Sequence, residues 1–512
     1  MSEDDPAGPG VAAADRAPAS RSGDIVRDFG LFAPWAVIAY CLALAALRIS
    51  LSPFLEIDEA EFVGNVDFRL LYDNAHPPLY NWATRIALVL TDWSWAQAMA
   101  MVKYSLLALY HYLIWNCATR LAGPRAGAMA LAASAFLPQV LWMSAATLSH
   151  SVMILAGAAA TLHAVLRVLE APHWRSYAWL GVAITLGALA KFNFALLLAP
   201  LLLAFASHPK GRALFTAPGA WAAPATLLLL CGPTYIAALL FPESSGARLG
   251  KLYRESDFAA LDLPGVGVDG GIELARALGA WAGAALAVWA GARLYDHHRG
   301  GGGAARRSVP IGAARLTAAD VGEILGRAML IGLALLALLV LAADISAVEE
   351  RYLTPLLAVT PVYLALRWPL GRSAPAVLMA ALTLYASVFA GLWAMTTFDA
   401  HRFKLPYAAI AAQIRVAEFA PAPIIAQRHV DRANLVLALG WPGARAPRYQ
   451  ALQDDAILLW PGRGAPPERL VPPGFGPASP ITTVAAPYAN RSGAEAVYRF
   501  QRFVRTVRPP TG

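Results

Sequence analysis

Charge is scarce in this sequence. Only 14% of its 512 residues are Asp, Glu, Lys or Arg, whereas soluble globular proteins have about 25%. Hydrophobic residues make up 58% of the chain, and the mean hydropathy is +0.50. This balance excludes an ordinary soluble globular protein and indicates that lipid is the solvent for much of the chain.

Cysteine and several catalytic motifs are also scarce or missing. Cys41, Cys117 and Cys231 lie inside apolar runs and have no Cys-x-x-Cys spacing, so neither a disulfide framework nor a thiolate metal site is indicated. The usual signals of nucleotide hydrolysis, zinc proteolysis and serine hydrolysis are absent from the sequence. The net charge of +8 is spread between apolar runs and forms no basic stripe, so no nucleic-acid partner is predicted.

Long apolar runs are what the sequence does have. A helix crosses about 30 Å of hydrocarbon with about 20 residues, and about eleven runs approach or reach that length. We predict an all-α polytopic membrane domain over residues 31–397, preceded by a disordered cytoplasmic N-terminus over 1–30. The first 30 residues are polar, unlike a cleavable signal peptide, so the first run is expected to remain as an anchor. The runs lie near residues 31–49, 98–118, 126–146, 150–169, 177–190, 192–207, 220–240, 273–292, 325–343, 352–366 and 374–396.

Lys and Arg gather in alternate connections between these runs, and positive residues are retained in the cytoplasm during insertion. The pattern predicts a cytoplasmic N-terminus and an extracytoplasmic C-terminus, in the inner membrane of a bacterium. The opposite connections include an acidic first loop over residues 50–97. The basic connections contain Arg120 and Arg125, Arg167 and Arg175, Lys210 and Arg212, Arg293 to Arg315, and Arg367 with Arg372.

The tail differs from the rest of the chain, because its apolar runs are shorter. A helical segment near residues 404–419 is followed by strand-like segments at 423–427, 456–460 and 481–485. This pattern predicts a small extracytoplasmic α/β domain over residues 398–512.

The first outer loop holds the residues most suited to chemistry. It contains Leu55-Glu-Ile-Asp-Glu-Ala-Glu-Phe62 and then Asn74-Ala-His-Pro-Pro-Leu-Tyr-Asn-Trp82. Transfer of a group to a hydroxyl needs a base for the acceptor proton, and donors or cations for an anionic leaving group. Asp58 beside Glu59 suits the base, because burial and a second acid both raise the pKa of a carboxylate. The alternative is that the two acids only solvate an outer loop.

A set of motifs resembles the GT-C class of membrane glycosyltransferases, in its protein O-mannosyltransferase-like and aminoarabinose-transferase-like branch. Within that branch the motifs are most similar to the galacturonosyltransferases that modify lipopolysaccharide. The resemblance covers roughly residues 30–370 and is weak over the tail. It is carried by Asp58-Glu-Ala-Glu61, Pro77-Pro-Leu-Tyr-Asn-Trp82, Leu148-Ser-His-Ser-Val152, Leu189-Ala-Lys-Phe-Asn193 and Glu350-Arg-Tyr-Leu-Thr-Pro355.

The resemblance implies that Asp58 is the catalytic base and that Glu59 is its acidic neighbour. It also implies a polyprenyl-phosphate-sugar donor, and an acceptor that is an envelope glycolipid, a polysaccharide or a protein. Aminoarabinose transferases carry Arg where this chain has Glu61 and Lys where it has His76. The contacts to the donor phosphate are therefore expected to differ from those of that enzyme.

Nine further residues are candidates for substrate binding. The guanidinium of Arg351 can grip two phosphate oxygens, and the loop of Lys251 and Arg254 could close over the site. The alternatives are snorkelling for Arg351 and the two single lysines, packing for His76, and an ordinary solvated loop. The nine are His76, Tyr80, Lys103, His150, Lys191, Lys251, Arg254, Arg351 and Tyr352.

We therefore expect an inverting glycosyltransferase in which Asp58 deprotonates the acceptor. No ligand spacing demands a metal ion, yet a divalent metal stays open because acids and His76 are available. One alternative is a transporter or lipid flippase, which tends to bind its cargo near the bilayer midplane rather than in an outer loop. A second alternative is a non-catalytic membrane partner that uses its C-terminal domain for binding.

Overall fold

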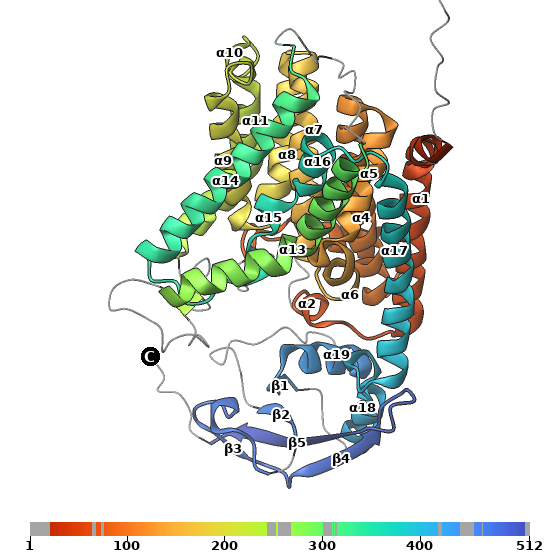
Figure 1. Ribbon diagram of the computed structural model, residues 1–512. Helices are drawn as coiled ribbons and strands as arrows, with labels where there is room; N and C mark the ends of the chain where they lie inside the picture. Colours follow the sequence, from red (N-terminus) through yellow and green to blue (C-terminus); the bar gives the residue numbers. More distant parts are fainter. Residues whose placement is uncertain are drawn as a thin grey trace, which may run out of the picture.

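The computed structural model describes residues 21–63, 68–72, 76–242, 252–253, 268–300, 310, 312, 315–417, 422–440, 455–462 and 464–506. Long helices form a bundle at one end of the molecule, and a small sheet with two helices lies at the other end (Figure 1). This arrangement matches the predicted fold class.

The bundle is built from helices that cover every predicted apolar run. Six of the described helices are long and apolar enough to cross a membrane, or seven if a bent pair forms one span. The other runs form shorter or more polar helices, so the number of about eleven spans stays a prediction. The helices are α1 (Arg21–Leu51), α4 (Trp95–Ala122), α5 (Pro124–Ala135), α6 (Ser144–Ala146), α7 (His150–Glu170), α8 (Trp174–Ala188), α9 (Ala195–Ser207), α10 (Ala213–Thr216), α11 (Ala222–Leu240), α13 (Val268–His298), α14 (Ala318–Ala342), α15 (Thr354–Leu357), α16 (Thr360–Arg367) and α17 (Ala374–Phe398).

The predicted run over residues 126–146 is not one straight helix. It breaks after α5, and the following helical segment over Gln139–Ala146 is bent from α5 by 81°. Pro138 stands at the break, and a proline cannot donate the backbone hydrogen bond that would continue the helix. A π-helical turn over Gln139–Met143 then leads into α6. The break brings Gln139 and Met143 to the end of the bundle that faces the sheet.

The segment over residues 50–97, which was predicted to be an outer loop, contains two helices that were not predicted individually. The short α2 (Ile57–Ala60) follows the end of α1, and α3 (Leu79–Leu90) begins after Pro78. One face of α3 packs on the bundle, whereas Ile86, Val89 and Leu90 are exposed. An apolar exposed face beside a membrane bundle is typical of a helix lying in the bilayer interface.

The tail forms a five-stranded sheet with two helices, α18 (Tyr407–Val416) and α19 (His429–Leu439). The strand order is β1-β2-β5-β3, and β4 also pairs with β5. Strands β1 and β2 are parallel and joined through α19, whereas β5 is antiparallel to its neighbours. The strands are β1 (Ile424–Ala426), β2 (Asp455–Pro461), β3 (Phe475–Pro477), β4 (Thr482–Pro487) and β5 (Glu495–Arg505).

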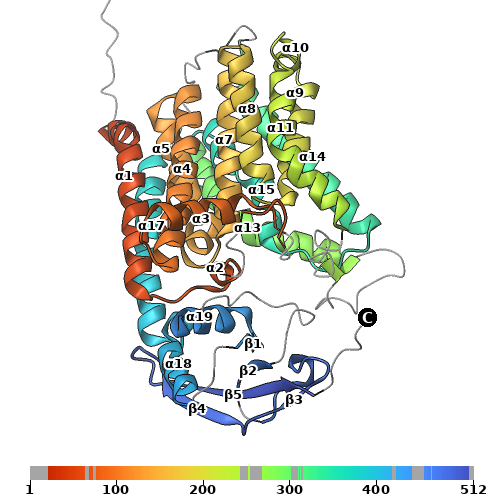
Figure 2. The same ribbon diagram turned by 180° about the vertical axis from the view of Figure 1, so that it is seen from behind.

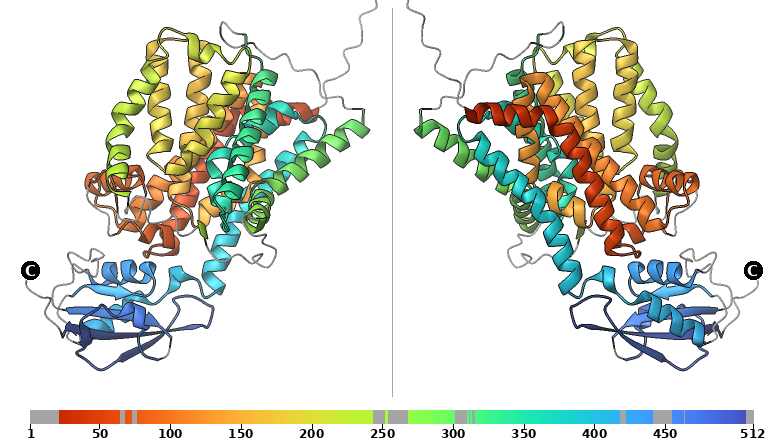
Figure 3. Two further views of the ribbon diagram at one scale, coloured as in Figure 1. Left: turned by 90° about the vertical axis from the view of Figure 1, so that its left-hand side faces the viewer. Right: turned by 90° about the vertical axis from the view of Figure 1, so that its right-hand side faces the viewer.

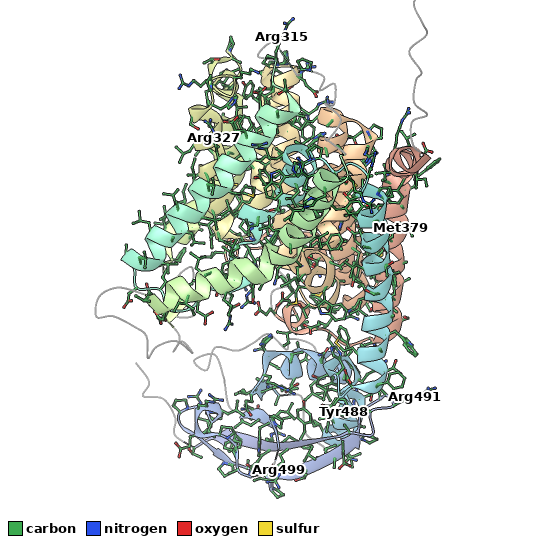
Figure 4. All side chains as sticks on the ribbon, viewed as in Figure 1. Arg315, Arg327, Met379, Tyr488, Arg491 and Arg499 are labelled. Atoms are coloured by element: carbon green, nitrogen blue, oxygen red, sulfur yellow. The ribbon has the colours of Figure 1, made fainter. Side chains whose placement is uncertain are left out.

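The basic connections meet at the end of the bundle away from the sheet. There Lys210 Nζ donates to Asp320 Oδ2 at 2.7 Å, and Arg293 donates to the carbonyl of Pro369 at 2.9 Å. Figure 2 shows α8, α9 and α10 reaching this end, with the sheet at the opposite end. Figure 4 likewise places Arg315 far from Arg499. The connections rich in Lys and Arg therefore lie at one end of the bundle, and the connections that were predicted on the opposite side of the membrane lie at the other end.

Candidate active site

A cavity of about 270 Å³ lies at the end of the bundle that faces the sheet. Asp58 and Arg351, which are almost 300 positions apart in the sequence, both line it. Figure 1 shows α2 at this end, between the bundle and α19, and Figure 3 shows the sheet on the same side of the bundle. The lining residues are Glu56, Ile57, Asp58, Gln139, Met143, Thr147, Leu148, Glu349, Glu350 and Arg351.

Asp58 is presented by the single turn of α2. Glu56 caps this turn: its side chain accepts from the helix N-terminus, while Glu59 accepts from the backbone N–H of Glu56 at 2.9 Å. Asp58 Oδ2 accepts a hydrogen bond from the backbone N–H of Ser149, at the start of α7, at 3.4 Å. The carboxylate is therefore fixed by two elements and remains partly exposed to the cavity.

Glu59 does not share the cavity with Asp58. It is 1% exposed and forms a buried ion pair with Arg48, at the end of α1, at 2.5 Å. Burial alone would raise the pKa of Glu59, but the charge and hydrogen bond of Arg48, followed by the charge of Lys103, outweigh it. The pKa of Glu59 therefore lies below its usual range, and this carboxylate holds α2 against the bundle.

The C-terminal region braces the same turn from the other side. Asn434 of α19 donates to the carbonyl of Leu55 at 2.9 Å and accepts from its N–H at 2.7 Å. His429 Nε2 lies 3.0 Å from the carbonyl of Ile57. Because Leu55 is buried, its backbone groups need protein partners. The sheet end of the molecule thus helps to position Asp58.

Replacing Asn434 by Ala is expected to lower activity about tenfold, because two buried hydrogen bonds of roughly 1 kcal/mol each are lost beside Asp58. The matched control is Asn490→Ala, since Asn490 donates to the carbonyls of Thr396 and Asp399 and touches no part of α2. Initial rates in proteoliposomes with equal amounts of inserted protein measure the effect. Equal rates for the two variants would show that the brace does not position the acid.

Arg351 enters the cavity from the turn before α15. Its guanidinium pairs with Glu349, and both side chains are about one-third exposed. The carbonyl of Tyr352 accepts from Asn193 at 3.2 Å, and Lys191 Nζ donates to Ser151 Oγ at 2.8 Å. The predicted residues Arg351, Tyr352 and Lys191 are thus brought to the same end of the bundle as Asp58.

A group of rings packs behind α2. The ring centroids of His76 and His150 lie 4.0 Å apart, and those of Phe62 and His150 lie 4.5 Å apart. Tyr80 is buried against the same rings. Glu61 Oε2 lies 3.8 Å from His76 Nε2. Glu61, His76 and His150 form a group that could hold a metal ion.

The remaining predicted residues are Lys103, whose charge acts on Glu59, and two residues that the structure does not describe. Lys103 is 1% exposed, and its Nζ lies 3.4 Å from the carbonyl of Ala145. The alternative that it snorkels to the surface is therefore wrong. Lys251 and Arg254 lie outside the described residues, so their contacts stay a prediction. Between them, the carbonyl of Leu252 accepts from the N–H of Ser346 at 3.1 Å.

Several site residues were missed by sequence reasoning. Glu349 and Gln139 line the cavity, and Arg48 holds Glu59. Arg48 carried a signal, because it is a cation at the outer end of the first apolar run. Gln139 carried none, since only the bend after α5 brings it to the cavity.

The chain is similar in sequence to known glycosyltransferases. Residues 75–236 match a family model described as dolichyl-phosphate-mannose-protein mannosyltransferase. The lipopolysaccharide core galacturonosyltransferase RgtA of Rhizobium johnstonii is 27% identical over 460 residues, which cover 83% of this chain and 85% of the relative. RgtB of the same organism is 27% identical over 447 residues, with the same shares covered.

A solved structure has a similar fold. The crystal structure of ArnT from Cupriavidus metallidurans in the apo state superposes with a TM-score of 0.54, covering 91% of this chain and 97% of that chain. The sequence identity is 15%, so this likeness concerns the fold alone. The predicted fold, a helical membrane protein of GT-C type with a small C-terminal sheet region, is confirmed.

Proposed function

We propose that the chain is a membrane glycosyltransferase of the GT-C class, related to the lipopolysaccharide core galacturonosyltransferases, and that it glycosylates a lipopolysaccharide-type acceptor. The proposed donor is a sugar linked to a polyprenyl phosphate, and the site would face the extracytoplasmic side of the membrane. The observation that carries the proposal is that Asp58 and Arg351 line one cavity at the end of the bundle that faces the sheet.

In the proposed reaction, Asp58 takes the proton of the acceptor hydroxyl. The acceptor oxygen attacks the anomeric carbon from the face opposite the phosphate, and the bond from that carbon to the phosphate oxygen breaks. The electron pair leaves with the phosphate, so the products are the inverted glycoside and polyprenyl phosphate. Arg351 is proposed to stabilise the departing phosphate with charge-assisted hydrogen bonds.

Two structural features support the proposed sidedness. The basic connections gather at the end of the bundle opposite the cavity, as expected for a cytoplasmic face. The acidic turn of α2 and the C-terminal sheet lie together at the cavity end. We propose that residues 31–397 form the transmembrane domain and residues 398–512 the extracytoplasmic domain.

The direct test is transfer in vesicles that contain the purified protein, a lipopolysaccharide acceptor and galacturonic acid linked to polyprenyl phosphate. Formation of the glycosylated acceptor with release of polyprenyl phosphate supports the proposal. Movement of the lipid-linked sugar across the bilayer without transfer would instead support the flippase alternative. Binding without either event would support a non-catalytic partner.

Replacing Arg351 by Lys is expected to raise the KM for the donor by about tenfold, because a point charge replaces a two-pronged donor. Arg351→Ala should cost about 10- to 100-fold in kcat/KM, the worth of one charged hydrogen bond. It also leaves the charge of Glu349 without this guanidinium. Arg327→Lys is the control, since Arg327 pairs with Glu323 within one helix of the bundle and does not line the cavity. Unchanged donor kinetics in Arg351→Ala would contradict the assignment.

A further inference from the structure

Three possible metal ligands converge beside Asp58. They are Glu61, His76 and His150, and their ligand atoms all lie within 4.8 Å of one another. The two imidazoles are 9% and 3% exposed, whereas Glu61 faces partly outward. Two imidazoles and one carboxylate are the protein ligands of many zinc and other divalent-metal sites that keep open positions.

Separate elements bring these ligands together. Glu61 ends α2, His76 precedes the two prolines before α3, and His150 begins α7. Phe62 and Tyr80 pack against the His150 ring at 4.5 and 5.3 Å between centroids. Such an apolar shell fixes ring orientation and restricts water, as the surroundings of metal ligands commonly do.

The distances require only a small closure. Two ligand atoms bound to one zinc-sized ion at about 2.0–2.2 Å are at most about 4.4 Å apart. Glu61 Oε2 and His76 Nε2 already lie within that limit, at 3.8 Å. All three ligand atoms lie within 4.8 Å of one another, so no pair exceeds the limit for one ion by more than a few tenths of an ångström.

The charge of the neighbouring cavity provides an independent reason for a cation. Its described lining contains four carboxylates, those of Glu56, Asp58, Glu349 and Glu350, and one guanidinium, that of Arg351. Arg351 is itself paired with Glu349. A phosphate entering this cavity would meet an excess of negative charge, which a bound divalent ion would offset.

Two of the three possible metal ligands are close in sequence to Asp58 or to its hydrogen-bond partner. His150 directly follows Ser149, whose N–H contacts Asp58 at 3.4 Å, and Glu61 is three residues after Asp58. An ion held by the three ligands would therefore lie behind the turn that presents Asp58, although none of the three is among the described residues that line the cavity. The contact with phosphate is therefore tested separately from the binding of the ion.

We propose that Glu61, His76 and His150 bind one divalent cation of the zinc type, and that this ion contacts the donor phosphate. The binding site stands on the geometry of the trio, whereas the contact with phosphate rests on the proposed function. The ion would add to the positive charge of Arg351 beside a lining with four carboxylates, and would stabilise the phosphate as the glycosidic bond breaks.

Metal binding can be measured without any donor. Purified protein is stripped with a chelator and titrated with Zn²⁺ and, separately, Mn²⁺, and bound metal is counted by mass spectrometry after desalting. We expect about one ion per chain in the wild type, and at least about 100-fold weaker binding in Glu61→Gln and His150→Ala. Glu61→Gln changes little packing, so its loss of metal would not reflect unfolding. The control His297→Ala/His298→Ala removes an exposed histidine pair on α13 and should retain the ion.

The outcomes separate the two parts of the proposal. Absence of a stoichiometric ion, or its retention in both trio variants, would overturn the site. If the ion binds as expected but stripped wild-type protein transfers sugar at the full rate, the contact with phosphate is refuted. Loss of transfer on stripping and recovery with metal supports it. A wild type that binds metal but transfers no sugar under any condition would refute the proposed function and leave the site standing.

Discussion

Replacing Asp58 by Asn is expected to lower the transfer rate by about 10²- to 10⁴-fold, the usual contribution of a general base. Asn has the same shape and can still accept from the Ser149 N–H, so α2 should keep its position. What it loses is the ability to take the acceptor proton. Rates in vesicles with equal amounts of inserted protein, at saturating donor, measure the change.

The matched control for this experiment is Glu350→Gln. Glu350 lines the same cavity, so this variant removes one negative charge without touching α2. A loss confined to Asp58→Asn would identify the base. Near-normal transfer by Asp58→Asn would refute its role, and an equal loss in both variants would point to the charge of the cavity instead.

Replacing Arg48 by Met is expected to destabilise the protein by about 3–5 kcal/mol, because Glu59 would remain buried with its charge unpaired. Thermal unfolding in detergent should show a large fall in melting temperature. The double variant Arg48→Met/Glu59→Leu should recover much of the loss, since buried pairs are often replaced by apolar residues at little cost. The result would assign Glu59 a structural role.

Arg120→Met is the control for this experiment. Arg120 pairs with Glu170 at the far end of the bundle, where both side chains are about one-quarter exposed. Pairs near the surface contribute only about 0–1 kcal/mol, so this variant should stay near the wild type. Equal stability of Arg48→Met and wild type would contradict the importance of the buried pair.

The Arg48–Glu59 pair also has a pH dependence of known sign. The pKa of Glu59 is lower in the folded protein than its usual value of 4.5. Its contribution to stability is therefore present above about pH 4.5 and is lost as the pH falls through the folded pKa.

Much of the helical bundle could be predicted from the sequence because hydropathy reports which segments prefer lipid. All the apolar runs are helical, and α18, β1, β2 and β4 fall on the predicted segments of the tail. The bend after α5 was missed because Pro138 interrupts a run without lowering its hydropathy much. In the tail, α19, β3 and β5 were not predicted. In the structure, the residues of β5 from Ala496 to Phe500 alternate between buried and partly exposed, as expected for a strand.

The candidate site could be predicted only in part. The acidic loop identified Asp58 and His76 as residues of interest, and a separate motif identified Arg351, but nothing local separates Asp58 from Glu59. That distinction depends on Arg48, which takes Glu59 out of the cavity. The brace by Asn434 joins residues 379 positions apart, and such contacts leave no mark in a single sequence.

The most direct test of the account is the accessibility of position 58. In spheroplasts carrying Asp58→Cys, a membrane-impermeant maleimide should label the protein from outside, and added polyprenyl phosphate should slow the labelling. The native cysteines are buried, and Arg315→Cys, at the opposite end of the bundle, should react only after permeabilisation. Labelling of position 58 only from the cytoplasmic side, or at a rate that polyprenyl phosphate does not change, would contradict an outward-facing site for a lipid-linked donor.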